Sequence, residues 1–395
     1  MRLWLVAVTG SLLSLTSPAL AVCDIAAPDA AHAGGEACIR PWLDAHMHLN
    51  QLQYVGTAES YKLAPSDALL SLIRMGGKKD AEALDFGQPP LAQQLDAGAR
   101  ALEFDVAYDP QGGLFKSPAG ASMASDLLDP AYVSAMSQPG FKVIHVLDVD
   151  FRSTCLTFKD CLIEVAAWSR AHKGHLPILI ALHANDAKTP MPGATKPIAF
   201  DANAFAALDA EIRAVFQPNE LVTPDDVKGG HANLREAIQT SGWPTLGKLR
   251  GKVIFLLDDP AKKTDIYAGA AKSLDGRPMF IATDEHSPLA SFICIEDPLR
   301  DQTRITQDVA AGFIVKTRAD ADTREARAGN PARRDAAFAS GAQIVATDFL
   351  MPDKKIGPYQ VNLADGQKAQ CDAKLPGQQC VSWNERPRQI AASAQ

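Results

Sequence analysis

Eight short apolar runs, separated along the chain by helix-like stretches, are the feature that most constrains the fold of this sequence. The runs are rich in Val, Ile and Phe, and they lie at 52–57, 101–107, 142–147, 177–182, 252–257, 278–282, 312–317 and 343–347. Helix-like stretches occur between them, for example at 91–97, 161–171, 202–214 and 268–272. Such regular alternation predicts an α/β protein, and eight repeats predict a closed (β/α)8 TIM-type barrel rather than an open sheet.

The length and composition of the chain agree with one large domain. It has 395 residues, of which 47% are hydrophobic, and it shows no low-complexity tract. Barrels of this class often reach this size as a single domain. We therefore predict a barrel over residues 49–363, preceded by a segment at 22–48 and followed by a polar tail at 364–395.

The N-terminus has the pattern of a cleaved signal peptide over residues 1–21. Arg2 provides a positive charge, residues 3–15 are mostly apolar, and Ala19-Leu20-Ala21 forms a small-x-small cleavage site. The apolar stretch is shorter than the roughly 20 residues of a membrane-spanning helix. We therefore expect an exported protein, either periplasmic or secreted.

The cysteine pattern also suggests export. Six of the seven cysteines form close pairs along the sequence, and Cys294 has no obvious mate. Close pairs in an exported chain predict local disulfides, and free buried thiols are the alternative. The three expected pairs are Cys23/Cys38, Cys155/Cys161 and Cys371/Cys380.

The charge of the chain excludes some classes of partner. The formal net charge is −7, and no basic cluster suited to nucleic acid or to anionic lipid headgroups is present. Residues 349–351 (FLM) lie close to Lys354 and Lys355. This segment either covers one end of the barrel or touches a lipid surface, so we expect at most peripheral contact with a membrane.

Polar side chains lie in or directly after every predicted strand. In a (β/α)8 barrel, the carboxyl ends of the strands form the active-site face. Polar residues gathered there therefore predict a functional site. In chain order they are Glu59; Glu103 and Asp105; His145 and Asp148; His183 and Asn185; Asp258 and Asp259; Asp284, Glu285 and His286; Arg318 and Asp320; and Asp348.

Glu103 and Asp105 are the strongest indication of a metal site. They are two residues apart in one predicted strand, so both side chains point to the same side. Two adjacent carboxylates repel each other unless a cation or a basic side chain lies between them. Oxygen ligands favour Ca²⁺, Mg²⁺ or Mn²⁺.

His145 lies inside an otherwise apolar run, with Asp148 three residues on. A histidine in such a run is often a hydrogen-bonded core residue. Here Asp148 is positioned in sequence to orient the ring, and an imidazole titrates close to neutral pH. We therefore treat His145 as a candidate general acid or base.

Several longer segments resemble the bacterial calcium-dependent phosphoinositide phospholipase C family. The opening motif of the family is similar to 50–62 (NQLQYVGTAESYK), its second motif to 102–105 (LEFD), and its third to 140–155 (GFKVIHVLDVDFRSTC). Further similarity lies at 317–323 (TRADADT) and 340–349 (SGAQIVATDF). The resemblance implies a barrel phosphodiesterase that uses one calcium ion and two histidines.

The chain departs from the family pattern at two places. Where the family has His-Asn, this sequence has Ala58-Glu59, so the first catalytic histidine and one calcium ligand are absent. Where the family has a metal-binding Glu and a Lys two residues later, this sequence has His183 and Asn185. The site nevertheless keeps two histidines and three carboxylates. Compared with the family, a histidine is lost at the first place and gained at the second, and a carboxylate is lost at the second and gained at the first.

This exchange suggests a rearranged but working site. We predict that Glu59, Glu103 and Asp105 hold a divalent cation, with His183 as a further ligand and with His145 and His183 as the acid and base. The resemblance implies Ca²⁺, whereas a histidine ligand favours Mn²⁺ or Zn²⁺. Arg318, Asn185 and Asp148 are the expected substrate contacts. The expected substrate of this monomer is a small-molecule or lipid phosphodiester, such as an inositol phosphate.

Two other functions remain open. His46 and His48 form a His-x-His sequence that resembles the first metal motif of amidohydrolases, and Asp348 would match their last ligand. That alternative is a metal hydrolase of another bond type. The other is a catalytically inactive phospholipase C-like protein that binds inositol-like ligands in the old pocket.

Overall fold

The computed structural model describes residues 35–363 and 367–372, and eight of its parallel strands close into a barrel. Neighbouring strands pair in register, β7 and β8 meet through one parallel bridge between Ala282 and Phe292, and β10 pairs with β1 to complete the ring. The predicted (β/α)8 class is confirmed. In order around the barrel the strands are β1 (Leu52–Thr57), β2 (Ala101–Ala107), β4 (Ile178–Ala184), β6 (Val253–Leu257), β7 (Met279–Ile281), β8 (Phe292–Cys294), β9 (Ile314–Arg318) and β10 (Ile344–Thr347).

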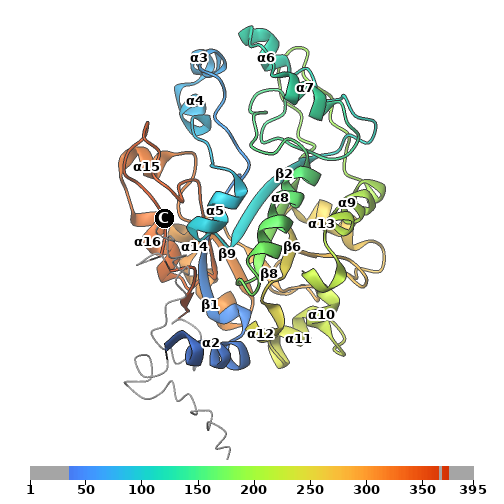
Figure 1. The fold of residues 1–395 in the computed structure, drawn as a ribbon, viewed down its shortest axis with the longest axis vertical. Helices are drawn as coiled ribbons and strands as arrows, with labels where there is room; N and C mark the ends of the chain where they lie inside the picture. Colours follow the sequence, from blue (N-terminus) through green and yellow to red (C-terminus); the bar gives the residue numbers. More distant parts are fainter. Residues whose placement is uncertain (1–34, 364–366, 373–395) are drawn as a thin grey trace, which may run out of the picture.

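Helices connect these strands and also cover the two ends of the molecule. Figure 1 shows α3, α4, α6 and α7 gathered at one end, and α2, α10, α11 and α12 at the other. The helices are α2 (Gly35–His46), α3 (Asp67–Gly76), α4 (Lys78–Leu84), α5 (Leu91–Ala97), α6 (Ala119–Ala124), α7 (Pro130–Met136), α8 (Phe158–Ala171), α9 (Ala202–Val215), α10 (Pro224–Lys228), α11 (Leu234–Thr240), α12 (Leu246–Leu249), α13 (Ala261–Ala268), α14 (Pro298–Ala310), α15 (Arg324–Ala328) and α16 (Ala332–Ala339).

The remaining elements are short and lie beside the barrel. The 3-10 turns η1 (Leu49–Gln51) and η2 (Pro218–Glu220) precede β1 and β5 (Leu221–Val222). β5 pairs with the start of β6, and β11 (Gln370–Cys371) pairs antiparallel with the start of β1.

Most of the predicted elements are confirmed, several with the same limits. β1, β2 and α5 have the predicted bounds, and α8 and α9 begin or end within three residues of the predicted stretches. Polar residues fix the starts of both long helices: the Thr157 side chain accepts a hydrogen bond from the Asp160 amide, and Asp201 accepts one from Ala204. Such N-caps satisfy amides that have no partner within the helix.

Two predicted elements are wrong. The run at 142–147 is not a barrel strand, because only β3 (Lys142–Val143) is extended, and it pairs antiparallel with the end of β2. Of the stretch 268–272, only Ala268 is helical, as the last residue of α13. The eighth barrel strand is instead β8, whose three residues are too few to show a strand period.

The segment between β2 and β4 builds a second, smaller core over one end of the barrel. Ile144 and Leu147, which made the 142–147 run apolar, pack there against residues of α3, α6 and α7. This packing explains the mistaken strand, since a short buried run has the same composition in either setting. It also carries His145 over the carboxyl ends of the barrel strands.

The predicted cysteine pairs are confirmed for one pair and partly described for another. A disulfide joins Cys155 to Cys161, and Cys294 is a free thiol. Cys371 is disulfide-bonded, and its predicted partner Cys380 lies outside the described residues. The side chains of Cys23 and Cys38 and the predicted signal peptide also lie outside them. Among the described helices, none is long and apolar enough to cross a membrane.

Candidate functional site

A cavity of about 330 Å³ lies at the carboxyl ends of the barrel strands and gathers most of the predicted site residues. Because the strands are parallel, their last side chains face the same end of the barrel. Lys263, Glu296 and Lys316 also line the cavity. The predicted residues that line it are Glu59, Glu103, Asp105, His145, His183, Asn185 and Arg318.

Glu103 and Asp105 point into this cavity from β2, as their spacing predicts. Phe104 between them faces the opposite way and is fully buried in the main core. Asp105 is paired in register with His183 of the neighbouring strand β4. Alternation along β2 and its pairing with β4 therefore place both carboxylates beside the second histidine.

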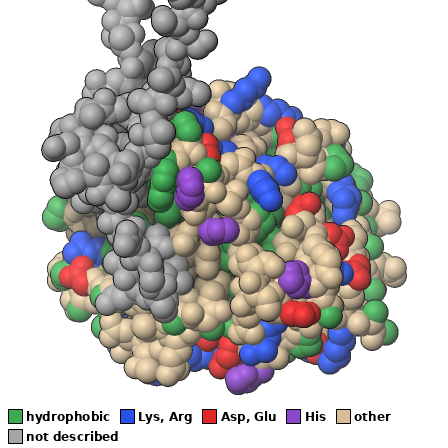
Figure 2. Space-filling model, turned by 90° about the horizontal axis from the view of Figure 1, so that it is seen from below, with side chains coloured by type: hydrophobic (Ala, Val, Ile, Leu, Met, Phe, Trp, Pro, Cys, Tyr) green, Lys and Arg blue, Asp and Glu red, His purple; other side chains and the backbone are tan. Residues whose placement is uncertain are grey.

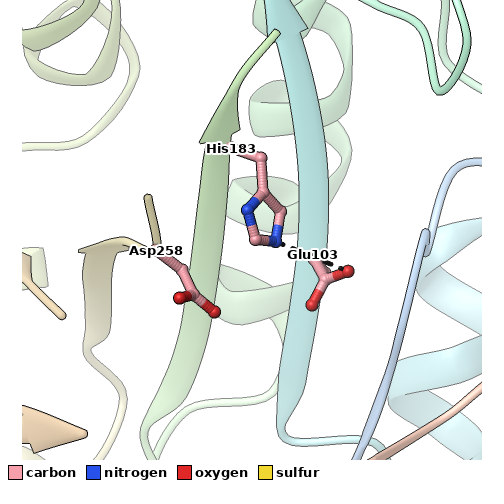
Figure 3. A group of neighbouring side chains, drawn as sticks. All are labelled: Glu103, His183 and Asp258. Carbon is pink, nitrogen blue, oxygen red and sulfur yellow. Dashed lines mark ion pairs between the residues drawn. The ribbon is translucent and has the colours of Figure 1, made fainter. Parts of the chain in front are cut away.

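Glu103, His183 and Asp258 form a compact group of possible metal ligands. One ligand atom from each lies within 4.8 Å of the others. Figure 3 shows the three side chains converging from β2, β4 and the end of β6, with His183 between the two carboxylates. His183 Nε2 lies 3.6 Å from Glu103 Oε1.

Lys316 of β9 forms ion pairs with the same two carboxylates. Its Nζ lies 2.6 Å from Glu103 Oε2 and 2.8 Å from Asp258 Oδ2, and the lysine side chain is almost fully buried. Burial raises the pKa of Glu103, but the charges of Lys316 and His183 outweigh it and bring that pKa well below its usual range. Burial lowers the pKa of His183, and Glu103 reverses the effect and raises it to about 10.

His145 is held by a carboxylate other than the predicted one. Its Nδ1 lies 2.8 Å from Asp150 Oδ2, and Lys62 Nζ lies 3.1 Å from the same oxygen. The prediction that Asp148 orients His145 is therefore wrong. Asp148 does not line the cavity, because its carboxylate accepts hydrogen bonds from the backbone and hydroxyl of Thr195 and from the Ala119 amide.

Glu59 faces the other nitrogen of the His145 ring. Glu59 Oε1 lies 3.4 Å from His145 Nε2 and 4.0 Å from Arg318 Nη1. Glu59 has a φ of 44°, in the left-handed region that non-glycine residues seldom adopt. Burial lowers the pKa of His145, but Glu59 and Asp150 together raise it to about 10, so the metal-free protein holds a protonated His145 at neutral pH.

Asp105 and Arg318 are each tied to one neighbour. The Tyr61 hydroxyl donates to Asp105 Oδ2 over 2.6 Å, and burial raises the pKa of Asp105 to about 6. Arg318 pairs with Asp348 and not with its closer sequence neighbours Asp320 and Asp322. Asp320 instead accepts from the Asp348 amide, and Asp322 pairs with Arg324.

His46 and His48 lie at the opposite end of the barrel. Both precede β1, so they are on the amino-terminal side of the strands. The His46 ring stacks on Trp42, and His48 Nδ1 contacts the Trp243 carbonyl oxygen. The amidohydrolase alternative, which needs both as ligands at the site, is therefore wrong.

The end of the molecule that carries α2 and α12 has a cavity of its own, lined among others by His48, Asp226 and Lys248. Figure 2 shows this end of the molecule, where histidine, acidic and basic side chains are scattered among apolar ones. At the opposite end, Phe349 and Leu350 are buried, and Met351 is 38% exposed. The FLM segment thus mainly covers the barrel end, as one of the two sequence-based interpretations proposed.

Sequence reasoning missed the roles of three residues at the site. Asp148 was preferred to Asp150 as the partner of His145 because it is nearer in sequence, but its side chain is turned away from the ring. Asp258 was noted at a strand end without a function. Lys316 lies inside a predicted strand, two residues before Arg318. That spacing puts both side chains on the same side of the strand, and it could have indicated a lysine in the site.

Comparison with known proteins identifies the family. A sequence model of the family described as Ca²⁺-dependent phosphoinositide phospholipase C matches residues 47–373. The chain belongs to this family. A search of curated proteins finds no significant match.

Solved structures show the same fold. The myoinositol complex of a calcium-dependent phosphoinositol-specific phospholipase C from Pseudomonas sp. is 18% identical, with a TM-score of 0.52, over 84% of this chain and 97% of that one. A second crystal form of the apo enzyme gives 17% identity and a TM-score of 0.51, over 83% and 96%. The Streptomyces antibioticus enzyme is 18% identical, with a TM-score of 0.48, over 76% and 94%.

Proposed function

We propose that this chain is an exported, metal-dependent phosphodiesterase of the phospholipase C type, acting on an inositol phosphate or a related phosphodiester. The observation that carries the proposal is the joint placement of His145 and His183 in one cavity, each against a carboxylate. Family membership and the Pseudomonas fold support the reaction class. The Cys155–Cys161 disulfide supports an oxidising compartment.

The residues of the site fit a divalent cation. Glu103 and Asp258 bring two negative charges. Lys316 balances one of them, and the proton on His183, which a cation would displace, balances the other. Glu103 Oε2 is buried, and the polar contact described for it is the ion pair with Lys316 Nζ. We assign the cation to Glu103, His183 and Asp258. Glu59 and Asp105, ligands in the prediction, are engaged with His145 and Tyr61.

The ligand atoms of the site influence which metal ion it prefers. Two carboxylates and one imidazole suit Mn²⁺ or Zn²⁺ better than an all-oxygen set does. Ca²⁺ remains the ion named for the family. When bound, such a cation supplies positive charge to a phosphoryl oxygen.

The other side chains would bind the phosphate and move a proton. Lys316 and Arg318 line the cavity and provide charge for the non-bridging oxygens of the phosphodiester. His145 Nε2 carries its proton toward the cavity, so His145 is placed to protonate the leaving oxygen as the P–O bond breaks. Asp150 fixes the ring by accepting from Nδ1. Glu59, beside Nε2, is placed to accept the proton of the attacking hydroxyl.

The metal content of the purified protein tests this proposal. We expect one divalent ion per chain in the wild type and its loss in Glu103→Gln, His183→Gln and Asp258→Asn. Asp259→Asn is the matched control, because Asp259 is next in sequence but lies outside the ligand group. Cleavage of glycerophosphoinositol should follow metal content.

The opposite result would favour an inactive binding protein. The ion pairs that Lys316 makes with Glu103 and Asp258 already balance part of the charge without a metal. No bound ion, no thermal stabilisation by Ca²⁺, Mn²⁺ or Zn²⁺, and no cleavage of phosphodiesters would together contradict the enzyme proposal. Binding of inositol phosphate under those conditions would establish the alternative.

A further inference from the structure

A second, larger cavity opens from the candidate active site. It has a volume of about 640 Å³ and shares the side chains of His183 and Glu296 with the first cavity. It extends along the ends of β6, β7 and β8 and the start of α13. A substrate whose phosphate lies beside His183 therefore has room for one of its ester groups in this second cavity.

The charge of the second cavity is predominantly negative. Its lining includes Asp258, Asp259, Asp265, Asp284 and Glu296, against the basic side chains of Lys272 and His183. Lys316 and Lys263 already pair with Asp258 and Asp259, whereas Asp265 and Asp284 are exposed toward the opening. The basic residues Lys263, Lys316 and Arg318 line the first cavity. A phosphate in the first cavity and a cation in the second would match this distribution.

The uncharged side chains of the second cavity indicate which kind of cation it would bind. Hydroxyl groups of Thr264, Thr283 and Ser287 line the second cavity, and no Phe, Tyr or Trp is among its lining residues. Quaternary ammonium groups are commonly bound by aromatic cages, whereas a primary ammonium group needs hydrogen-bond acceptors. Carboxylates and hydroxyls supply such acceptors.

We infer that the second cavity is the subsite for a primary ammonium group, so that the preferred substrate is a phosphodiester of an amino alcohol or amino sugar. This inference rests on the proposed phosphodiesterase function and names the substrate class for that same site. Asp265 and Asp284 are its specificity-determining residues, because they are exposed carboxylates that line the second cavity and not the first.

The test compares three water-soluble esters on the metal-loaded protein: glycerophosphoethanolamine, glycerophosphocholine and glycerophosphoinositol. We expect kcat/KM for the ethanolamine ester to exceed that for the inositol ester by about tenfold, as two partly exposed charge pairs would give. The preference should shrink at high salt, because exposed charges are screened.

Two variants assign the preference to the cavity. Asp265→Asn combined with Asp284→Asn should remove most of it, by lowering kcat/KM for the ethanolamine ester toward that for the inositol ester. Asp80→Asn, an exposed acid on α4 that does not line the cavity, is the matched control and should keep the preference.

Each other outcome has a defined meaning. Equal cleavage of all three esters overturns the inference and leaves the phosphodiesterase proposal intact, and a preference for the choline ester overturns the primary-amine assignment. If no ester is cleaved, the proposed function fails. Calorimetry with phosphoethanolamine and glycerol 3-phosphate then still decides the inference: tighter binding of the amine supports it, and equal binding contradicts it.

Discussion

His145 connects the local packing of one loop to the chemistry proposed for the site. The second core holds the backbone of this loop, and Asp150, which is itself paired with Lys62, accepts a hydrogen bond from Nδ1 of the ring. The free Nε2 then faces the cavity beside Glu59. A proton donor in this position has a fixed direction, which proton transfer requires.

Replacing His145 should remove proton transfer without unfolding the protein. We expect His145→Gln to lower kcat by about 10²- to 10⁴-fold, the usual contribution of a general acid or base. Metal content should be unchanged, because His145 lies outside the ligand group. Asp150→Asn should retain part of the activity and shift the alkaline limb of the pH–rate profile to lower pH. Unaltered kcat in His145→Gln would exclude this role.

The sequence predicted the side chains of the site better than their partners. The alternation of Glu103 and Asp105 follows from the strand period alone, and the structure places both in the cavity. The pairings of His145 with Asp150 and of Lys316 with Glu103 depend on how a loop folds over the barrel and on contacts between distant strands. No local period in the sequence encodes such contacts.

At the scale of elements, the contact between β1 and β2 sets the spacing of Glu59 and Glu103. Gly56 of β1 pairs with Ala101 of β2, and an added Cβ at Gly56 would lie 2.5 Å from the Ala101 Cβ. The strands approach this closely because position 56 has no side chain. The following residues of β1 then lead directly to Glu59.

Gly56→Ala should separate the two strands and disturb the site. We expect a loss of about 1–3 kcal/mol in the free energy of unfolding, typical of overpacking in a core, together with weaker metal binding. Gly76→Ala is the matched control, since an added Cβ there meets nothing within 4 Å. Urea unfolding of both variants measures the effect. A Gly56→Ala protein as stable as the control would show that β1 and β2 adjust freely.

The disulfide constrains the loop that enters α8. Cys155 and Cys161 are six residues apart, and the segment just before them is bonded to Tyr61 and Leu63 after β1. Converting both cysteines to serine should lower the unfolding free energy by about 2 kcal/mol, as expected for so small a closed loop. Treatment with a reductant should destabilise the wild type toward the level of the double variant. An equal response of both proteins to the reductant would contradict this account.

At the scale of the whole molecule, the barrel was predictable from the sequence, whereas the short strand β8 and the layer over the barrel were not. Seven of the predicted runs are barrel strands because a buried parallel strand is continuously apolar, which composition reveals. The eighth, β8, has three residues, and the 142–147 run belongs to the layer over the barrel. Both errors arise because an apolar run indicates that a segment is buried, but not which kind of element that segment forms.

The raised pKa of His183 links the stability of the whole fold to pH. The folded, metal-free protein holds a proton on His183 up to about pH 10, whereas the unfolded chain releases it near pH 6.5. The stability from this proton is therefore fully present below pH 6.5 and is lost as pH rises toward 10. His145 has the same sign and about the same pKa.

Metal binding should reverse this dependence, because a cation on His183 replaces the proton. Below the pKa of His183, the apparent affinity should rise about tenfold per pH unit for each proton displaced. We therefore expect the increase in Tm caused by a fixed concentration of Mn²⁺ to grow between pH 6 and pH 8. His183→Gln should abolish that growth, while Asp259→Asn should preserve it. Since the comparison is made at each pH with and without metal, titrating groups remote from the site cancel. A metal-induced shift in Tm that is the same at both pH values would mean that His183 is not a ligand and that the carboxylates alone hold the ion.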